Sequence, residues 1–382
     1  MRCTALLFWV SFMLVLAYTP LIAQHDHSHE EEPQHSEHSA QEAHAAEDTH
    51  SEEEFDITHT VMHHIADAHE FHAWGDHEHG FTLPLPIILW TDQGLVSFLS
   101  SAFHHNDDGS VVVERNGVRV VKYHEKIYYA LEEPNDHHAY IEYGEDHASV
   151  LNAKPLDFSI TKNVFSLLLS ALIMLLIFGS TAAKYKFGGA PKGIAGFMEP
   201  LILFVRDEIA RPNIEGERYK KFVPYLLTLF FFIWVNNLIG LIPIFPFSAN
   251  LTGNISVTLS LAFLTLLVTN VSANGGYWKH IFMPPVPLWL WPILVPVEII
   301  GVLSKPFALM IRLFANITAG HIIILSLTSL IFLFGTLLVA PVSVLFVLFM
   351  NFIELLVAAL QAYIFTLLTA LFIGLASPAE HH

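Results

Sequence analysis

The stretch IRLFANITAGH, residues 311–321, places an arginine, an asparagine and a histidine inside an apolar run that extends from about Pro296 to Phe334. Such a run is longer than the roughly 20 residues that cross a bilayer as a helix. A charged side chain at membrane depth costs about 2.5 to 3.5 kcal/mol on insertion scales. The run therefore predicts a membrane helix in which Arg312 has a specific purpose.

The last two apolar segments are too long to stand upright in a bilayer. A helix from Pro296 to Phe334 extends about 57 Å, nearly twice the hydrocarbon thickness of about 30 Å. It must tilt steeply or break at Pro306. The final segment, Pro341 to Ala376, has the same excess length. Together they predict a long, strongly tilted antiparallel hairpin that forms a broad wall rather than a closed pore.

Three further apolar segments precede this hairpin, at Phe165–Ala182, Phe222–Pro243 and about Ser256–Ser272. The chain is thus expected to be an all-α polytopic membrane protein with about five transmembrane helices. Residues 195–215 alternate apolar and charged residues at helical spacing and are expected to lie along the cytoplasmic surface. Basic residues follow the first span and lie in the loop after the third, which predicts an N-terminus outside and a C-terminus inside.

The N-terminal third has a different composition. Residues 1–23 carry Arg2 and an apolar core and are expected to be a signal peptide, with an uncleaved anchor as the alternative. Cleavage would remove Cys3, the only cysteine in the chain. Residues 24–162 contain six basic and 28 acidic residues, a formal charge of −22. This charge excludes nucleic-acid binding.

Residues 24–55 form a tail rich in His and Glu that is expected to be disordered. A solvated tail, adventitious metal binding and a dedicated metal site remain open for its histidines, which show no fixed ligand spacing. Residues 56–155 are expected to form an amphipathic helix, Asp56 to His72, and a small β-rich extracytoplasmic region without a catalytic constellation. We call this β-rich region the cap. Within it, Asn116-Gly117 between two Val-rich runs is a strong hairpin signal.

Polar residues of the two long helices pair by depth. With the turn between Gly335 and Pro341, residues at one depth have position numbers with a constant sum, which matches Arg312 with Gln361 and His321 with Glu354. The two levels lie roughly 13 Å apart. Gln361 cannot neutralise Arg312, so the guanidinium needs another chain or water. The His321/Glu354 pair suits a proton relay, with a closed structural ion pair as the alternative.

Helical phase separates these groups further. At about 100° per residue, Glu298, Lys305 and Asn316 fall within about 40° of Arg312 on the helix surface. His321 lies on the opposite side. Arg312 is therefore expected to face a partner while His321 faces a different neighbour.

Four motifs carry a resemblance to a known family. They are FMEPLILFVRDEIARP (197–212), NNLIGLIP (236–243), LSKPFALMIRLFANITAGH (303–321) and FIELLVAALQAYIFTLLTALFIGLA (352–376). Taken in this order, they resemble subunit a of the F-type ATP synthase. The resemblance covers about residues 160–378, the expected membrane domain.

The resemblance implies a non-catalytic stator subunit, without cofactor, that holds two offset proton half-channels against a rotating ring of c subunits. Its partners would be the c-ring, the peripheral-stalk b subunits and the rest of the synthase in a bacterial inner membrane. Arg312 matches the essential arginine that faces the ring. The other positions implied in proton translocation are Asn316, His321, Glu354 and Gln361 on the outer side, Glu298 near the inner half-channel, and Lys305, which snorkelling would also explain.

The resemblance also implies that the histidine and the acid can exchange helices, since some bacterial members carry them the other way round. A metal-ion transporter that uses the His-rich tail as a collector is the alternative function. Such a transporter needs metal ligands grouped at the bilayer midplane. Only His321 and Glu354 offer them.

Overall fold

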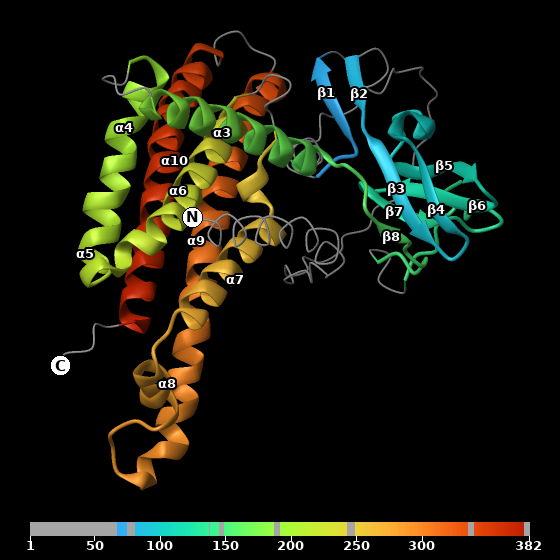
Figure 1. The fold of residues 1–382 in the computed structure, drawn as a ribbon. Coiled ribbons are helices and arrows are strands. Elements are labelled where there is room, and N and C mark those ends of the chain that lie inside the picture. The colour runs from blue at the N-terminus through green and yellow to red at the C-terminus, as the bar shows by residue number, and fades with distance from the viewer. Residues whose placement is uncertain are drawn as a thin grey trace, which may run out of the picture.

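The computed structural model describes residues 67–74, 81–136, 138–144, 149–186, 192–242, 249–334 and 340–377. The expected signal peptide, the tail and residues 56–66 of the expected amphipathic helix lie outside the described residues. The described chain forms a helical part and, beside the beginning of its first helix, the β-rich cap (Figure 1).

Each expected apolar span is a helix in the structure. The helices are α3 (Lys162–Lys186), α6 (Tyr219–Leu241), α7 (Ile255–Val271), α9 (Trp291–Phe334) and α10 (Ala340–Ala376). By length and composition, α3, α6, α9 and α10 can each cross a membrane, whereas α7 qualifies together with α8 (Gly275–Phe282), which meets it at 104°. The described helices therefore allow four or five crossings.

The two long helices exceed the expected length. α9 has 44 residues and α10 has 37, or about 66 and 56 Å at 1.5 Å per residue. α9 begins five residues before the expected start at Pro296 and continues through Pro296 and Pro306. The expected alternative of a break at Pro306 is therefore wrong.

A mostly helical segment joins α3 to α6. It consists of α4 (Ile194–Phe204), a π-helical stretch (Val205–Ala210) and α5 (Arg211–Asn213). In the helical core, the buried faces of α6, α9 and α10 pack together with this segment. Leu226, Leu313 and Ile373 are fully buried there. Short 3₁₀ turns lie at Ser100–Phe103, Gly216–Arg218, Leu251–Gly253 and Leu288–Leu290.

Gly374 permits the close approach of α10 to this segment. A Cβ at this position would collide with the backbone carbonyl oxygen of Asn213. We expect Gly374→Ala to destabilise the chain by about 1 to 3 kcal/mol, as over-packing does, and to lower the temperature at which the purified chain aggregates. Gly179→Ala on α3, where an added Cβ meets nothing within 4 Å, is the matched control. An unchanged aggregation temperature for Gly374→Ala contradicts the tight packing.

The cap consists of three small antiparallel sheets. β1 (Glu70–Trp74) pairs with β2 (Phe81–Pro84), while β3 (Pro86–Thr91) lies between β4 (Gly94–Leu99) and β8 (Leu156–Asp157). β6 (Val118–Tyr123) lies between β5 (Asp108–Arg115) and β7 (Lys126–Tyr129). The expected hairpin is confirmed, because Asn116 and Gly117 join β5 to β6 with φ of 52° and 78°, as a type I′ turn requires.

The prediction of an amphipathic helix is wrong at its C-terminal end. Residues 70–72 belong to β1, and their pairing partners in β2 lie 10 to 14 residues later in the chain. The apolar spacing of residues 56–72 fits a helix, but strand pairing and burial of Phe71 decide the structure here.

The cap is fixed to the beginning of α3. Asp67 accepts hydrogen bonds from the backbone N–H of Asn163 and from the Thr161 hydroxyl, both at 3.0 Å. The rings of Phe71 and Phe165 meet edge to face with centroids 5.4 Å apart. An aspartate at this place supplies a missing partner for the first N–H groups of a helix. The cap and α3 therefore share one junction.

Candidate functional site

His321 and Glu354 meet between the two long helices. The Nδ1 atom of His321 lies 2.8 Å from Oε1 of Glu354. The carboxylate is buried, with 4% of its side chain exposed, while 19% of the histidine side chain is exposed. The predicted pairing of these two residues by depth is confirmed.

A third helix contacts the histidine. His321 Nε2 lies 3.2 Å from the backbone oxygen of Gly240 at the end of α6, and Nδ1 also lies 3.1 Å from the oxygen of Ile317. All of these neighbours are acceptors, so only the doubly protonated ring donates from both nitrogens. The geometry therefore suits a histidine that takes up a proton.

Gly320 provides the space for the carboxylate. A Cβ at Gly320 would lie 2.7 Å from Oε1 of Glu354. Oε2 of Glu354 has no hydrogen-bond partner among the described residues. A buried carboxylate oxygen of this kind calls for water or a proton.

Arg312 occupies a different side of α9. The guanidinium is half-buried and has no hydrogen bond or ion pair within the described part of the chain. Its neighbours Ile311 and Ala315 are exposed, whereas Leu313 is fully buried. Arg312 therefore lies, partly covered, at the edge of a largely exposed face of α9.

The Arg312 level of the hairpin differs from the His321 level. Gln361 is buried, with 4% exposed. Within the described residues it forms no hydrogen bond with Arg312, whereas His321 and Glu354 form an ion pair. Equal depth fixes the position along the axis but not the direction in which each side chain points. Asn316, one turn from Arg312, is exposed.

Glu298 and Lys305 lie on the N-terminal part of α9. Glu298 is half-buried and Lys305 is exposed, with its Nζ atom 5.7 Å from the centre of the Phe372 ring. Lys305 also lines a cavity of about 20 Å³ that α7, α8 and α10 help to enclose. The side chains of Thr269 and Asn270 reach this cavity with buried oxygen atoms that lack partners among the described residues. A cavity of this size has room for one water.

The sequence did not indicate the support that α6 provides. Thr252 donates to the Oδ1 atom of Asn237 at 2.6 Å, and the Asn237 amide donates to the backbone oxygen of Ala358 on α10 at 3.2 Å. This buried pair fixes the end of α6, and with it the Gly240 carbonyl, against the helix that carries Glu354. The motif NNLIGLIP contains Asn237 and Gly240, but their partners Ala358 and His321 lie 121 and 81 positions away.

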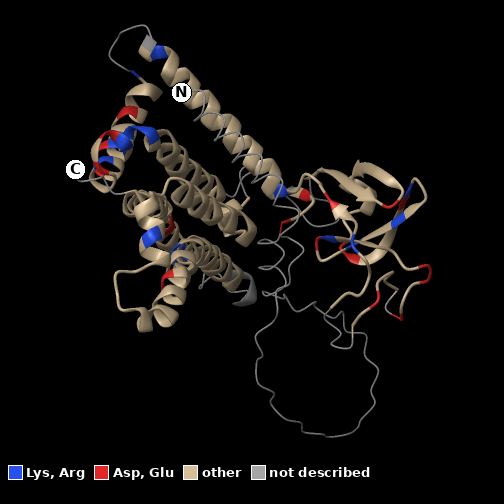
Figure 2. Ribbon diagram, turned by 60° about the horizontal axis from the view of Figure 1, so that its bottom comes forward, with Lys and Arg blue, Asp and Glu red and all other residues tan. Residues whose placement is uncertain are grey.

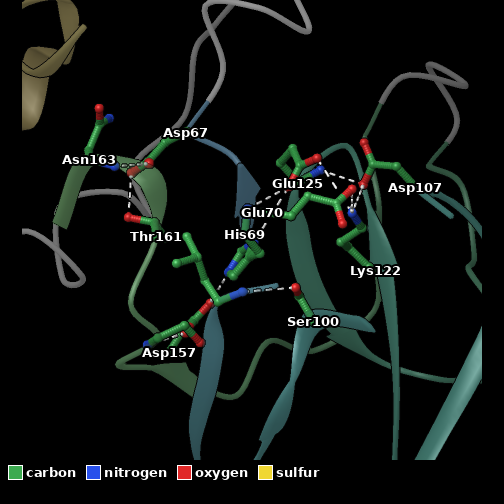
Figure 3. A network of polar contacts seen from close by, with 12 residues as sticks. Asp67, His69, Glu70, Ser100, Asp107, Lys122, Glu125, Asp157, Thr161 and Asn163 are labelled. Atoms are coloured by element: carbon green, nitrogen blue, oxygen red, sulfur yellow. Dashed lines mark hydrogen bonds and ion pairs between the residues drawn. The ribbon is translucent and has the colours of Figure 1, made fainter. Parts of the chain in front are cut away.

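A second polar cluster lies inside the cap (Figure 3). His69 is 3% exposed, and its Nε2 atom lies 3.3 Å from Asp157 while its backbone N–H donates to Glu125 at 3.0 Å. Lys122, 2% exposed, lies 3.5 Å from Glu125 and 3.9 Å from Asp107. Buried charges of this kind are tolerated only when they are paired.

These contacts shift the pKa values of the cluster. Burial alone lowers the pKa of His69, but hydrogen bonds and charges from Asp157 and Glu125 outweigh it and raise the pKa to about 9. Burial raises the pKa of Glu125, but contacts with His69 and Lys122 outweigh it and lower the pKa to about 2. Burial and the charge of Glu125 raise the pKa of Asp107 to about 6.

The cap should lose stability at alkaline pH. The stabilisation from His69 is complete below its ordinary pKa of 6.5 and is lost as the pH rises through about 9. The stabilisation from Glu125 is lost only as the pH falls through about 2. Asp107 acts in the same direction as His69, because its raised pKa favours the folded state at low pH and that contribution is lost as the pH rises through about 6.

Asp157→Asn tests this dependence. Removal of one partner should lower the pKa of His69 and shift the alkaline loss of stability from about 9 toward 6.5. Hydrogen exchange of β1 and β8, compared between variant and wild type at each pH, measures the shift. Asp136→Asn, at an exposed position, is the control. Equal alkaline profiles for Asp157→Asn and the wild type contradict the assignment.

Neither cluster assembles a metal site. Among the described residues, no three His, Cys, Asp or Glu side chains gather in a way that would hold a metal ion. The residues of the expected tail lie outside the described part of the chain.

Comparison with known proteins gives two matches to families. Residues 164–374 match the family described as ATP synthase A chain, and residues 60–158 match a domain of unknown function, DUF8433. The chain is 50% identical over 248 residues to ATP synthase subunit a of Chloroherpeton thalassium, an alignment that covers 63% of this chain and 73% of the relative. It is 44% identical over 247 residues to ATP synthase subunit a of Myxococcus xanthus, which covers 63% of this chain and 80% of the relative.

Proposed function

Because the chain belongs to the ATP synthase A chain family, it is a non-catalytic, multi-pass subunit of the membrane sector, and we propose that Arg312 and the His321/Glu354 pair carry its proton conduction. Its role is that of a stator with proton channels, working with the rest of the ATP synthase and its c-ring. The family match gives no support to a metal-ion transporter.

Protons enter, in this proposal, through the polar region between α6, α9 and α10. His321 accepts a proton there, with Glu354 as its counter-ion at 2.8 Å and the Gly240 carbonyl as a second acceptor. Asn316 and Gln361 extend the polar region toward the ring. The proton then neutralises a ring carboxylate, which can turn into lipid without a charge.

Arg312 separates this entrance from the exit. A ring carboxylate that approaches the guanidinium is stabilised in its charged form, so its pKa falls and its proton leaves. The same positive charge opposes a direct proton path past it. Each charge that crosses 100 mV supplies about 2.3 kcal/mol, which biases the rotation.

Release to the other side uses the N-terminal part of α9. Glu298 and Lys305 lie there, and the water-sized cavity beside Lys305 brings polar groups of α7 to the same place. We infer that this region begins the inner half-channel. The orientation with the cap outside and the C-terminus in the cytoplasm, and contact with peripheral-stalk b subunits, belong to the same proposal and rest on the basic residues after α3.

The observation that carries the proposal is the contrast between the two ionisable sites of α9. His321 is paired inside the helix bundle, whereas Arg312 lies half-buried at the edge of an exposed face, without an ion-pair partner within the described part of the chain. A guanidinium at membrane depth needs such a partner. A passing carboxylate of the ring supplies it.

The test is ATP-driven acidification of inverted membrane vesicles. Cells that lack the chain should give vesicles without acidification, and expression of the chain should restore it. Acidification in vesicles without the chain would contradict the proposed role.

A further inference from the structure

One face of the cap is flat, apolar and uncharged. The alternation of side chains in β4, β3 and β8 turns one set of residues outward, since Trp90 pairs with Leu95 on one side and with Leu156 on the other. Of this set, Trp90 and Leu95 are each 58% exposed. The face consists of Pro86, Ile88, Trp90, Leu95, Ser97, Leu99, Leu156 and Phe158.

The opposite side of this sheet is the core of the cap. Ile87, Leu89 and Val96 are buried there against β5, β6 and β7. β3 and β4 contain no charged residue, and Asp157 of β8 turns to His69 on the inner side. Figure 2 shows the charged residues of the cap spread over its strands and loops. Exposed uncharged patches of this kind usually mark an interaction surface.

The chain leads from this face directly into the membrane. Phe158 precedes Lys162, the first residue of α3, by four residues, a separation of at most about 14 Å. α3 has 25 residues, about 37 Å, whereas the hydrocarbon core is about 30 Å thick and the bilayer with its headgroups about 40 to 45 Å. The beginning of α3 therefore lies at headgroup level, and the face lies within reach of it.

The junction keeps the face at this height. Asp67 is bonded to both Thr161 and Asn163, and β8 itself is part of the face. Strands β5 and β6 form the side of the cap farthest from the helices (Figure 1), so the outer face of β4, β3 and β8 is not the side farthest from the membrane. Farther along α3, Leu172 and Leu176 are also exposed.

We propose that this face rests on the headgroup region of the leaflet in which α3 begins. Trp90 supplies the residue type that favours the membrane interface. The strongly acidic remainder of the cap stays in water, while the uncharged face meets the bilayer. The partner is a lipid surface rather than a protein, because the chain leads from the face into a helix whose exposed side would lie against lipid. The inference depends on α3 crossing the membrane and not on the roles of Arg312 or His321.

Fluorescent labelling of the assembled complex in liposomes tests the proposal. Cys3 is the only cysteine of the chain, so Cys3→Ser gives a background into which Leu95→Cys, Leu99→Cys and, as a control on β5, Glu114→Cys are introduced. We expect probes at positions 95 and 99 to lose about half of their emission when the lipids carry nitroxide headgroups, since interfacial groups lie at that depth. A probe at position 114 should be quenched by aqueous iodide instead.

Two outcomes overturn the proposal. Equal iodide quenching at positions 95 and 114 places the face in water. Shielding of position 95 from iodide without quenching by the labelled lipids shows that a protein covers it. ATP-driven acidification measured with the same vesicles keeps the two questions separate, because a failed lipid contact with intact pumping leaves the proton-channel role standing.

Discussion

Replacement of Arg312 by alanine should abolish ATP-driven proton pumping while the complex still assembles. Without the guanidinium, a ring carboxylate that passes α9 keeps its proton, because nothing stabilises the charged form. The positive barrier between the two half-channels also disappears, so passive proton leak through the membrane sector should rise. Acidification of inverted vesicles measures the first effect, and decay of an imposed pH gradient measures the second.

Two further variants sharpen this result. Arg312→Lys keeps a positive charge but loses the planar guanidinium, so it should pump far more slowly than the wild type and leak less than Arg312→Ala. Lys220→Ala removes a surface cation that pairs with Glu217 and should pump normally. Pumping by Arg312→Ala at the wild-type rate, in an assembled complex, would rule out the proposed role of the arginine.

The His321/Glu354 pair should tolerate exchange better than loss. His321→Ala and Glu354→Gln each leave one member of a buried pair without its partner, which costs about 3 to 5 kcal/mol in comparable pairs. We expect proton pumping to fall by a factor of about 100 or more in each, as it does when positioned proton-transfer groups are removed. The double variant His321→Glu with Glu354→His restores a histidine beside a carboxylate and should recover part of the lost rate.

Two controls identify the cause of the loss. Gly320→Ala keeps both groups but pushes a Cβ toward the Glu354 carboxylate, so it should slow pumping in the wild-type background. Asn351→Ala removes an amide that bonds only the Val347 carbonyl of its own helix and should leave pumping unchanged. Equal pumping rates in the exchanged double variant and the two single variants would refute a shared role for the pair.

Much of the membrane part could be predicted from the sequence because its physics is local. Runs of apolar residues without charges form helices in lipid, since the backbone must satisfy its own hydrogen bonds there. The constant sum of position numbers at one depth predicted the pairing of His321 with Glu354, because two antiparallel helices keep a constant register. The same rule does not predict how far a side chain is rotated about the axis, which is why Gln361 is buried while Arg312 lies on the open face.

The cap depended on contacts that are distant in the sequence. The hairpin at Asn116-Gly117 is encoded by two adjacent residues and was predictable. β1 was not, because its pairing with β2 and the burial of Phe71 depend on residues elsewhere. The clearances at Gly320 and Gly374 are also set by other segments, and glycine in a helix indicates no particular neighbour.

The bond between Asp67 and Asn163 has a consequence for biosynthesis. These residues are 96 positions apart, and β8, which completes the sheet of β3, is also made late. A ribosome therefore delivers the last strand of the cap only just before the start of α3, and the partners of the anchoring carboxylate arrive with the start of α3 itself. Maturation of the cap thus waits for arrival of the first span, and a fragment ending before residue 156 would lack the final strand of its own sheet.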